Sequence, residues 1–160
     1  MVAVVLLAQS SGKPGWMSGI LGASITAPHL LGPLIARRLD VADDGRRVIA
    51  VSAVVHGLLL GTAGWLLPVA RVIVPTVLLV VAGMFGPMLT GGVSSRLPSI
   101  AGPTQKSQRS AQSWDVASYG VSGTLGPAIT AWISAAAGPM GAVLVLAASA
   151  IIGAGAGLVL

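Results

Sequence analysis

Gly32-Pro-Leu-Ile-Ala-Arg-Arg-Leu-Asp-Val-Ala-Asp-Asp-Gly-Arg-Arg47 is the stretch that decides the fold of this 160-residue chain. It holds four of the nine Lys and Arg residues and three of the four acidic residues. On either side lie about twenty apolar residues, the length that a helix needs to cross a bilayer. The stretch therefore predicts a charged turn between two membrane-spanning helices.

The composition of the whole chain agrees with a membrane protein. Hydrophobic residues make up 54% and charged residues only 8%, with a mean hydropathy of +0.91. A soluble domain carries roughly 25% charged residues to cover its surface, so most of this surface must face lipid. The net charge of +5 is spread over connectors between apolar runs instead of forming a basic face, which argues against a nucleic acid partner.

Few residues in the chain can carry out chemistry. It contains no Cys and no Glu, and its two His residues are far apart in sequence. Metal centres and paired-carboxylate sites need clusters of such side chains. Ser52 and the pair Ser94-Ser95 have no positioned base nearby in sequence. We therefore expect no enzyme activity, no metal and no cofactor.

Five uncharged apolar segments are each long enough to span a membrane. The N-terminal piece 1–10 is too short, because nine helical residues reach only about 13 Å against roughly 30 Å of hydrocarbon. We expect it to be the outer part of a first helix that is truncated or whose start codon is misassigned. The predicted fold is an all-α polytopic transmembrane bundle forming a single domain, 1–160, with the partial span 1–10 and full spans at about 16–35, 48–67, 72–90, 116–136 and 141–160.

The basic residues predict how the bundle is oriented. Seven of them lie in the two long connectors, 36–47 and 91–115, which an alternating topology places on one side. Only Lys13 and Arg71 lie on the other side. Because loops rich in Lys and Arg stay in the cytoplasm, we expect both long loops to be cytoplasmic and the protein to be integral to a bacterial plasma (inner) membrane.

The charged stretch also carries a family resemblance. Ala36-Arg-Arg-Leu-Asp40 followed by Gly45-Arg46-Arg47 resembles the cytoplasmic signature Gly-x-x-x-Asp-Arg-x-Gly-Arg-Arg of major facilitator superfamily transporters, in their N-terminal six-helix half. Ala36 replaces the first Gly, Val41 replaces a basic residue, and two extra residues precede Gly45. The resemblance implies that Asp40, Gly45, Arg46 and Arg47 form a loop that joins helix ends and governs the inward–outward switch.

A second match lies in the fourth full span. Gly120 to Ala131 resembles the antiporter-subgroup pattern Gly-x-x-x-Gly-Pro-x-x-Gly-Gly of the same family. The resemblance implies that Ser122, Gly126 and Pro127 form a helix-packing motif in which Gly126-Pro127 supplies a bend. The approach from Arg109 to Asp115 is similar to the basic segment that precedes this helix in the family.

Small residues four apart recur elsewhere in the chain and allow close helix contact. The alternative for any one pair is simply the high Gly and Ala content. The pairs and triplet are Gly15/Gly19, Gly57/Gly61, Ser118/Ser122/Gly126 and Gly153/Gly157.

His29, His56 and Asp115 are candidates for a substrate or proton site, because an ionisable group inside a span is a functional hypothesis by default. A His suits proton coupling through its near-neutral pKa. The alternative for each His is a neutral ring bonded to a backbone carbonyl or a hydroxyl. For Asp115 it is an exposed residue at a helix N-terminus.

The resemblance implies secondary transport of a small solute by alternating access, driven by a gradient, with the substrate bound near the midplane between two halves. The expected partners are the lipid bilayer, a small-molecule substrate of unknown identity and a second six-helix half. The alternative is a non-transporting integral membrane subunit that packs against partner helices.

Overall fold

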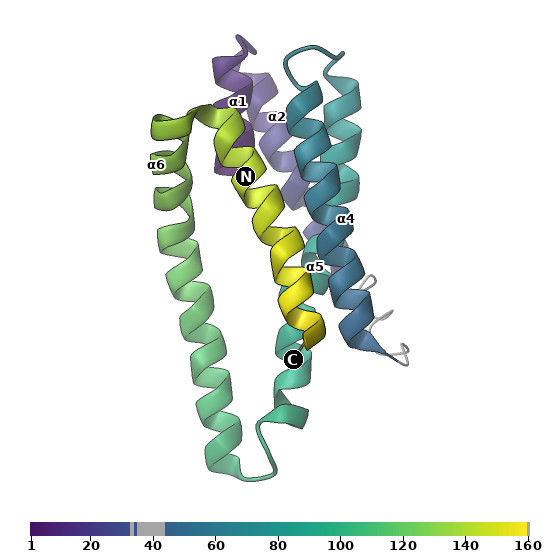
Figure 1. Ribbon diagram of the computed structural model, residues 1–160, viewed down its shortest axis with the longest axis vertical. Helices are drawn as coiled ribbons and strands as arrows, with labels where there is room; N and C mark the ends of the chain where they lie inside the picture. Colours follow the sequence, from purple (N-terminus) through teal and green to yellow (C-terminus); the bar gives the residue numbers. More distant parts are fainter. Residues whose placement is uncertain (33, 35–43, 160) are drawn as a thin grey trace.

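The computed structural model describes residues 1–32, 34 and 44–159, and over these ranges the chain is helix and turn without a β-strand. Three helices, α4, α5 and α6, are long and apolar enough to cross a membrane, which is consistent with an integral membrane protein. In chain order the elements are α1 (Val2–Ser10), α2 (Gly15–Thr26), the 3-10 helix η1 (Ala27–Leu31), α4 (Gly45–Leu66), α5 (Ile73–Ile100) and α6 (Gln105–Val159) (Figure 1).

Helix α6 consists of two limbs that run in opposite directions. Gly138 lies between them with φ 78° and ψ 160°, a region of backbone space that essentially only glycine occupies. Pro139 follows directly and cannot continue the preceding helix. The first limb covers 105–137 and the second 139–159, and the reversal falls within the expected 137–140 connector (Figure 1).

The segment expected to span 16–35 is helical but irregular. Its α-helical part ends at Thr26, and the chain continues as the 3-10 helix η1. Pro28 lies at the start of η1 and lacks the N–H that would bond the Ser24 carbonyl in an α-helix. The described α-helix is therefore only 12 residues long.

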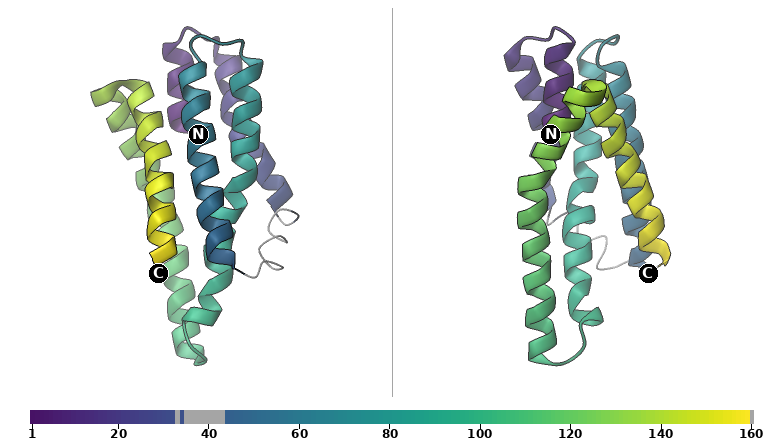
Figure 2. Two further views of the ribbon diagram at one scale, coloured as in Figure 1. Left: turned by 45° about the vertical axis from the view of Figure 1, so that its right-hand side comes forward. Right: turned by 60° about the vertical axis from the view of Figure 1, so that its left-hand side comes forward.

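The expected long polar loop at 91–115 is instead mostly helical. Helix α5 continues to Ile100 and α6 begins at Gln105, so only 101–104 separate them, with Gly102 at φ 84°. The hydroxyls of Ser94, Ser95 and Ser99 donate to carbonyls of their own helix, so polar side chains do not interrupt it. As a result, α5 and the first limb of α6 extend beyond the start of α4 (Figure 2).

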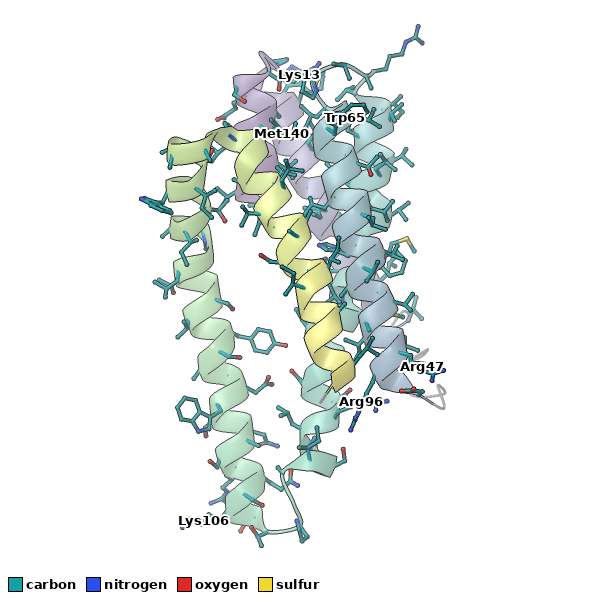
Figure 3. The ribbon with its side chains drawn as sticks, viewed as in Figure 1. Lys13, Arg47, Trp65, Arg96, Lys106 and Met140 are labelled. Carbon is teal, nitrogen blue, oxygen red and sulfur yellow. The ribbon has the colours of Figure 1, made fainter. Side chains whose placement is uncertain are left out.

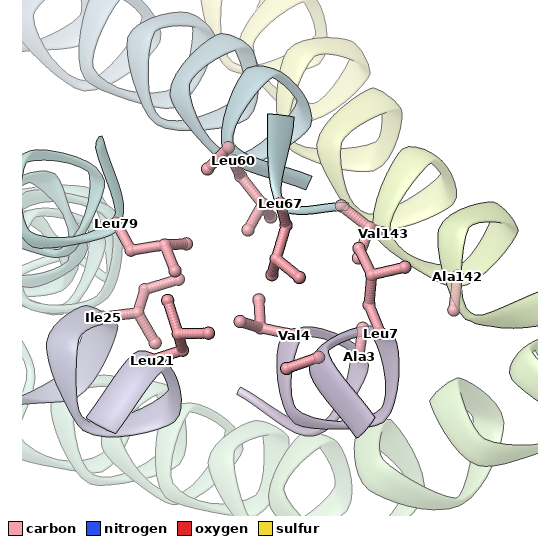
Figure 4. Close-up of a cluster of buried hydrophobic side chains, with 12 residues drawn as sticks. Ala3, Val4, Leu7, Leu21, Ile25, Leu60, Leu67, Leu79, Ala142 and Val143 are labelled. Atoms are coloured by element: carbon pink, nitrogen blue, oxygen red, sulfur yellow. The ribbon is translucent and has the colours of Figure 1, made fainter. Parts of the chain in front are cut away.

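The main hydrophobic core lies near the end of the bundle that carries α1. It joins side chains of α1, α2, α4, α5 and the second limb, including Leu7, Leu21, Leu67, Leu79 and Val143 (Figure 4). A smaller cluster of Ala50, Ala53 and Ala154 lies toward the other end. Lipid tails are as apolar as leucine, so these contacts hold helices together through close packing more than through exclusion of water.

Glycines allow close contact at two helix interfaces. A Cβ added at Gly57 would lie 2.7 Å from the Ala147 carbonyl oxygen, and one at Gly64 would meet Val143. Helix α4 therefore packs closely on the second limb. Gly83 of α5 lies against the backbone of Ile25 in the same way. By contrast, a Cβ added at Gly15, Gly19, Gly126 or Gly153 would have no atom within 4 Å. These glycines therefore do not allow a close helix contact within the described chain.

The first limb of α6 has little cover from the rest of the chain. Trp114, Val116, Leu125, Ile129 and Trp132 are all exposed, whereas Thr130 is buried. A helix that is apolar all round needs lipid or other helices around it. This limb is thus the part of the bundle with the most unoccupied apolar surface.

Candidate functional site

Basic side chains from three helices gather at one end of the bundle. Arg47, Arg96 and Lys106 lie toward this end, whereas Lys13 and Trp65 lie toward the other (Figure 3). The arrangement follows from the alternating direction of the helices, because α4 begins toward the end of the bundle at which α5 ends and α6 begins. We call this the basic end, defined by Arg46, Arg47, Arg96, Lys106 and Arg109.

Asp44 fixes the start of α4 at the basic end. Its carboxylate accepts hydrogen bonds from the backbone N–H groups of Arg46 (3.1 Å) and Arg47 (3.4 Å), which is a helix N-cap. The same carboxylate forms an ion pair with Arg47 Nε at 3.0 Å. The Arg47 and Asp44 side chains are 81% and 49% exposed, so the pair adds little to stability. Its role is to set where α4 begins.

Gly45 and Arg96 join α4 to α5 at this end. Gly45 is buried, and a Cβ added there would overlap the guanidinium of Arg96. Arg96 therefore lies directly across the backbone of the predicted loop motif. Of the four residues expected to form the switch loop, Gly45, Arg46 and Arg47 are at the start of α4, and Asp40 lies outside the described residues.

His56 connects α4 to α5 inside the apolar region. Its Nδ1 lies 2.8 Å from the Ala82 carbonyl oxygen. Because a carbonyl can only accept, Nδ1 carries the proton in this contact. The geometry matches the alternative weighed for this residue, a ring bonded to a backbone carbonyl between helices, and it leaves Nε2 available to a second partner.

His29 lies at a different interface, between η1 and α5. The ring contacts Gly86, where a Cβ would overlap it, and the residue as a whole is exposed. No hydrogen bond of its ring is found among the described residues. The structure thus places His29 and His56 on different helices that both contact α5, within four residues of each other along that helix at Gly86 and Ala82.

Asp115 is not at a helix N-terminus, because α6 begins ten residues earlier at Gln105. It is half-buried, and within the described ranges its carboxylate forms no ion pair with Arg109. The expected dipole explanation therefore does not apply to this residue. Its backbone carbonyl accepts a hydrogen bond from the Ser118 hydroxyl at 2.7 Å.

The predicted packing motif lies in the first limb. Ser122 Oγ donates to the Tyr119 carbonyl and Thr130 Oγ1 to the Gly126 carbonyl, so both hydroxyls are used within the helix. The backbone remains helical through Gly126 and Pro127, and the non-helical residue is Gly138. Since no side chain reaches Gly126, the motif presents a small-residue face with no partner in the described chain.

Tyr119 provides one polar contact between the first limb and α5, and Gln108 Nε2 provides another by donating to the Pro98 carbonyl at 2.7 Å. Its hydroxyl donates to the Thr90 carbonyl at 2.8 Å and lies 3.0 Å from Ser94 Oγ. Few other contacts join these two elements. Tyr119 therefore holds the first limb to α5 at a point farther from the 101–104 turn than the contact of Gln108.

Changing Tyr119 to phenylalanine is expected to loosen this contact while keeping the ring. Loss of one interhelical hydrogen bond costs about 0.6 kcal/mol in a membrane bundle, and the distance between the two helices should broaden. Spin labels at Thr90→Cys and Ser122→Cys would report that distance, since the chain has no native cysteine. An unchanged distance distribution in the phenylalanine variant would contradict the role.

Arg96 and Tyr119 are two site residues that were not predicted from the sequence. Tyr119 is the only tyrosine, and a hydroxyl within an apolar segment must find a partner, which was the available signal. Arg96 was counted only as a loop charge. Its contact with Gly45 depends on α5 remaining helical beyond Thr90, which hydropathy does not reveal.

Within the part of the chain that the structure describes, no three His, Asp or Glu side chains lie together as metal ligands would. Comparison with protein families, with curated proteins and with solved structures finds no match for this chain. The assignment of a function therefore rests on the residues and geometry described above.

Proposed function

We propose that this chain is the N-terminal six-helix half of a secondary transporter of the major facilitator type, which moves a small solute across a bacterial inner membrane. The observation that carries the proposal is the basic end. It brings together the Gly45-Arg46-Arg47 motif and Arg96 of the neighbouring helix. An asymmetry of this kind is typical of the cytoplasmic face of a membrane protein.

The proposal includes five full spans together with the shorter α1. Helices α4 and α5 and the two limbs of α6 supply four of them, and α2 together with η1 belongs to the fifth. The spans alternate in direction, so Lys13 and Arg71 face outward and the basic end faces the cytoplasm. In this proposal, residues 1–160 form a single transmembrane domain.

Alternating access requires helices that move as units against one another. The contacts at Gly57 and Gly64 tie α4 to the second limb, and Gly83 ties α5 to η1 and α2. The first limb is joined to α5 by the hydrogen bonds of Tyr119 and Gln108. We propose that the loop motif controls the relative movement of α4 and α5 through the Gly45–Arg96 contact.

The site of the transported solute would lie near the bilayer midplane, toward a second half of the transporter. The exposed small-residue face at Ser122 and Gly126 supports such a partner. His56, with its second ring nitrogen available, is the residue that we propose for proton coupling. No enzymatic step, metal or cofactor is part of this proposal.

Transport by membrane vesicles tests the function. Inverted vesicles prepared from native membranes, in which the chain can pair with its second half, should move one or more members of a panel of fluorescent cationic, neutral and anionic solutes, and a protonophore should stop the movement. The double variant Arg46→Ala/Arg47→Ala should lose it, whereas Lys13→Ala/Arg71→Ala, with the same loss of charge at the other end, should retain it. Correctly inserted protein that moves none of these solutes would contradict the proposal.

The exposed first limb also favours the second candidate, a non-transporting subunit that packs against partner helices. Ser122→Cys should then cross-link to an unrelated membrane protein in native membranes, with no solute movement in vesicles. Cross-linking to a homologous six-helix half would instead favour the transporter.

Labelling of single cysteines tests the proposed orientation. A membrane-impermeant maleimide added to intact cells should label Ser11→Cys and leave Ser107→Cys unlabelled, because the two positions lie at opposite ends of the bundle. In inverted vesicles the pattern should reverse. Labelling of both positions from the same side would show that the helices do not alternate as proposed.

A further inference from the structure

A cavity of about 490 Å³ lies at the basic end between α4, α5 and the second limb of α6. Arg46 and Arg96 line one part of it. The rest of the wall is largely apolar and includes Ile49, Ala53, Leu89 and Ala150. The cavity therefore combines a cationic part with an apolar part, and its volume is within the range of ligand-binding pockets.

The two arginines are the only side chains in the wall with hydrogen-bond donors to offer. Ser99 and Ser149 also line the cavity, but their hydroxyls donate to carbonyls of their own helices at 2.7 Å. Asp44, the nearest described carboxylate in sequence, pairs with Arg47 and caps α4. A ligand that meets this wall encounters two guanidinium groups, which suit the oxygens of a phosphate.

The position of the cavity along α4, relative to the thickness of a bilayer, indicates that its ligand is a membrane lipid. Helix α4 has 22 residues and is therefore about 33 Å long, close to the roughly 30 Å thickness of the hydrocarbon layer. Arg46 is in the first turn of α4, so its charge lies at the level of the lipid headgroups. Apolar residues such as Ala53 and Leu89 extend the wall from there toward the hydrocarbon.

We propose that this cavity is a binding site for an anionic membrane lipid. Arg46 and Arg96 hold the phosphate, and the beginning of an acyl chain lies along the apolar wall formed by Ile49, Ala53, Leu89 and Ala150. Basic pockets between transmembrane helices are suited to this kind of ligand. The site does not depend on solute transport, and it places a lipid beside the Gly45–Arg96 contact between α4 and α5.

Native mass spectrometry of the detergent-purified protein can test the site by counting bound phosphatidylglycerol. We expect one tightly bound molecule and weaker binding of phosphatidylcholine. Arg46→Ala and Arg96→Ala should each reduce the affinity for phosphatidylglycerol about tenfold, as expected for the loss of a charge-assisted hydrogen bond. Arg109→Ala is the matched control, because it removes the same charge at the same end but Arg109 does not line the cavity.

A variant that keeps both arginines separates the apolar part from the charge. Gly153 lines the cavity and has nothing within 4 Å of an added Cβ, so Gly153→Leu should fold and fill the space. It should lose the tightly bound lipid although Arg46 and Arg96 remain. Circular dichroism of each variant would confirm that the helices are intact.

Competition with inorganic phosphate distinguishes a lipid from a soluble anion. Phosphate in the millimolar range should not displace phosphatidylglycerol, since it lacks the acyl chain. Displacement by phosphate alone would overturn the lipid assignment. Equal binding by the wild type, Arg46→Ala, Arg96→Ala and Gly153→Leu would overturn the site itself, whatever the result of the transport assays.

Discussion

Leucine in place of Gly57 is expected to destabilise the bundle by about 3 kcal/mol, the upper part of the usual range for an overpacked core. The Cβ alone would lie 2.7 Å from the Ala147 carbonyl oxygen and 2.9 Å from Ile151 Cγ1. A backbone oxygen cannot rotate out of the way, so α4 and the second limb must separate. Titration of the solubilised protein with SDS, followed by circular dichroism, would measure the change.

Gly126→Leu is the control for this prediction. It makes the same exchange within an apolar helix, but nothing lies within 4 Å of Gly126, so the change in stability should stay within about 0.5 kcal/mol. If the two variants unfold at the same SDS concentration, the close contact between α4 and the second limb is contradicted. A functional defect of Gly126→Leu without loss of stability would instead support a partner on the first limb.

Alanine in place of Gly138 is expected to cost about 2 kcal/mol, because the backbone there, at φ 78° and ψ 160°, is strained for any residue with a Cβ. No atom lies within 4 Å of the added Cβ, so the effect would come from the backbone alone. The reversal between the two limbs would then broaden. Spin labels at Ser118→Cys and Ser149→Cys, one on each limb, would detect this as a wider distribution of distances.

Gly91→Ala provides the comparison, since Gly91 also has open space around its Cβ position but lies within α5 at ordinary helical angles. Alanine there should be neutral or should stabilise the helix by up to about 1 kcal/mol. Equal effects of the two alanine variants would show that the reversal does not depend on the conformation of Gly138.

The Gly-Pro dipeptides show how far the sequence predicts the fold. Gly102 and Gly138 each precede a proline and adopt positive φ at chain reversals, whereas the Gly-Pro pairs at Gly86 and Gly126 remain inside helices. The dipeptide alone does not distinguish these outcomes. What distinguishes them is their place relative to the spans: Gly86 and Gly126 lie inside an apolar span, where a helix in lipid keeps its hydrogen bonds through a proline rather than expose backbone groups, whereas Gly102 and Gly138 lie between two spans.

Residues 91–115 show a different limit. Their polar composition predicts a region at the membrane surface, but hydropathy reports the surroundings of a residue and not its backbone conformation. Serines 94, 95 and 99 are compatible with a helix because their hydroxyls bond within it. For the same reason Arg96, which touches Gly45, could be predicted as a surface charge but not as a contact of the loop motif.

The residues proposed for function were predictable to different degrees. His56 stood out as an ionisable group in an apolar segment, and the structure supplies its partner, the Ala82 carbonyl. The partner is a backbone carbonyl, which every residue has, so no sequence pattern could identify it. Asp115 stood out as the only acidic residue beyond the charged stretch, but its position in the third turn of a helix depended on where α6 begins.

The length of the first limb of α6 has a mechanical consequence. Its residues, 105–137, form a rod of about 50 Å, whereas the hydrocarbon layer is roughly 30 Å thick. If Gly138 acts as a pivot, a tilt of ten degrees there would swing Gln105 through about 9 Å. Because residues 101–104 and the hydrogen bond from Gln108 to the Pro98 carbonyl join this end to α5, such a tilt would have to carry the end of α5 with it, and a small rotation at one end of the bundle would become a large joint displacement of two helices at the other.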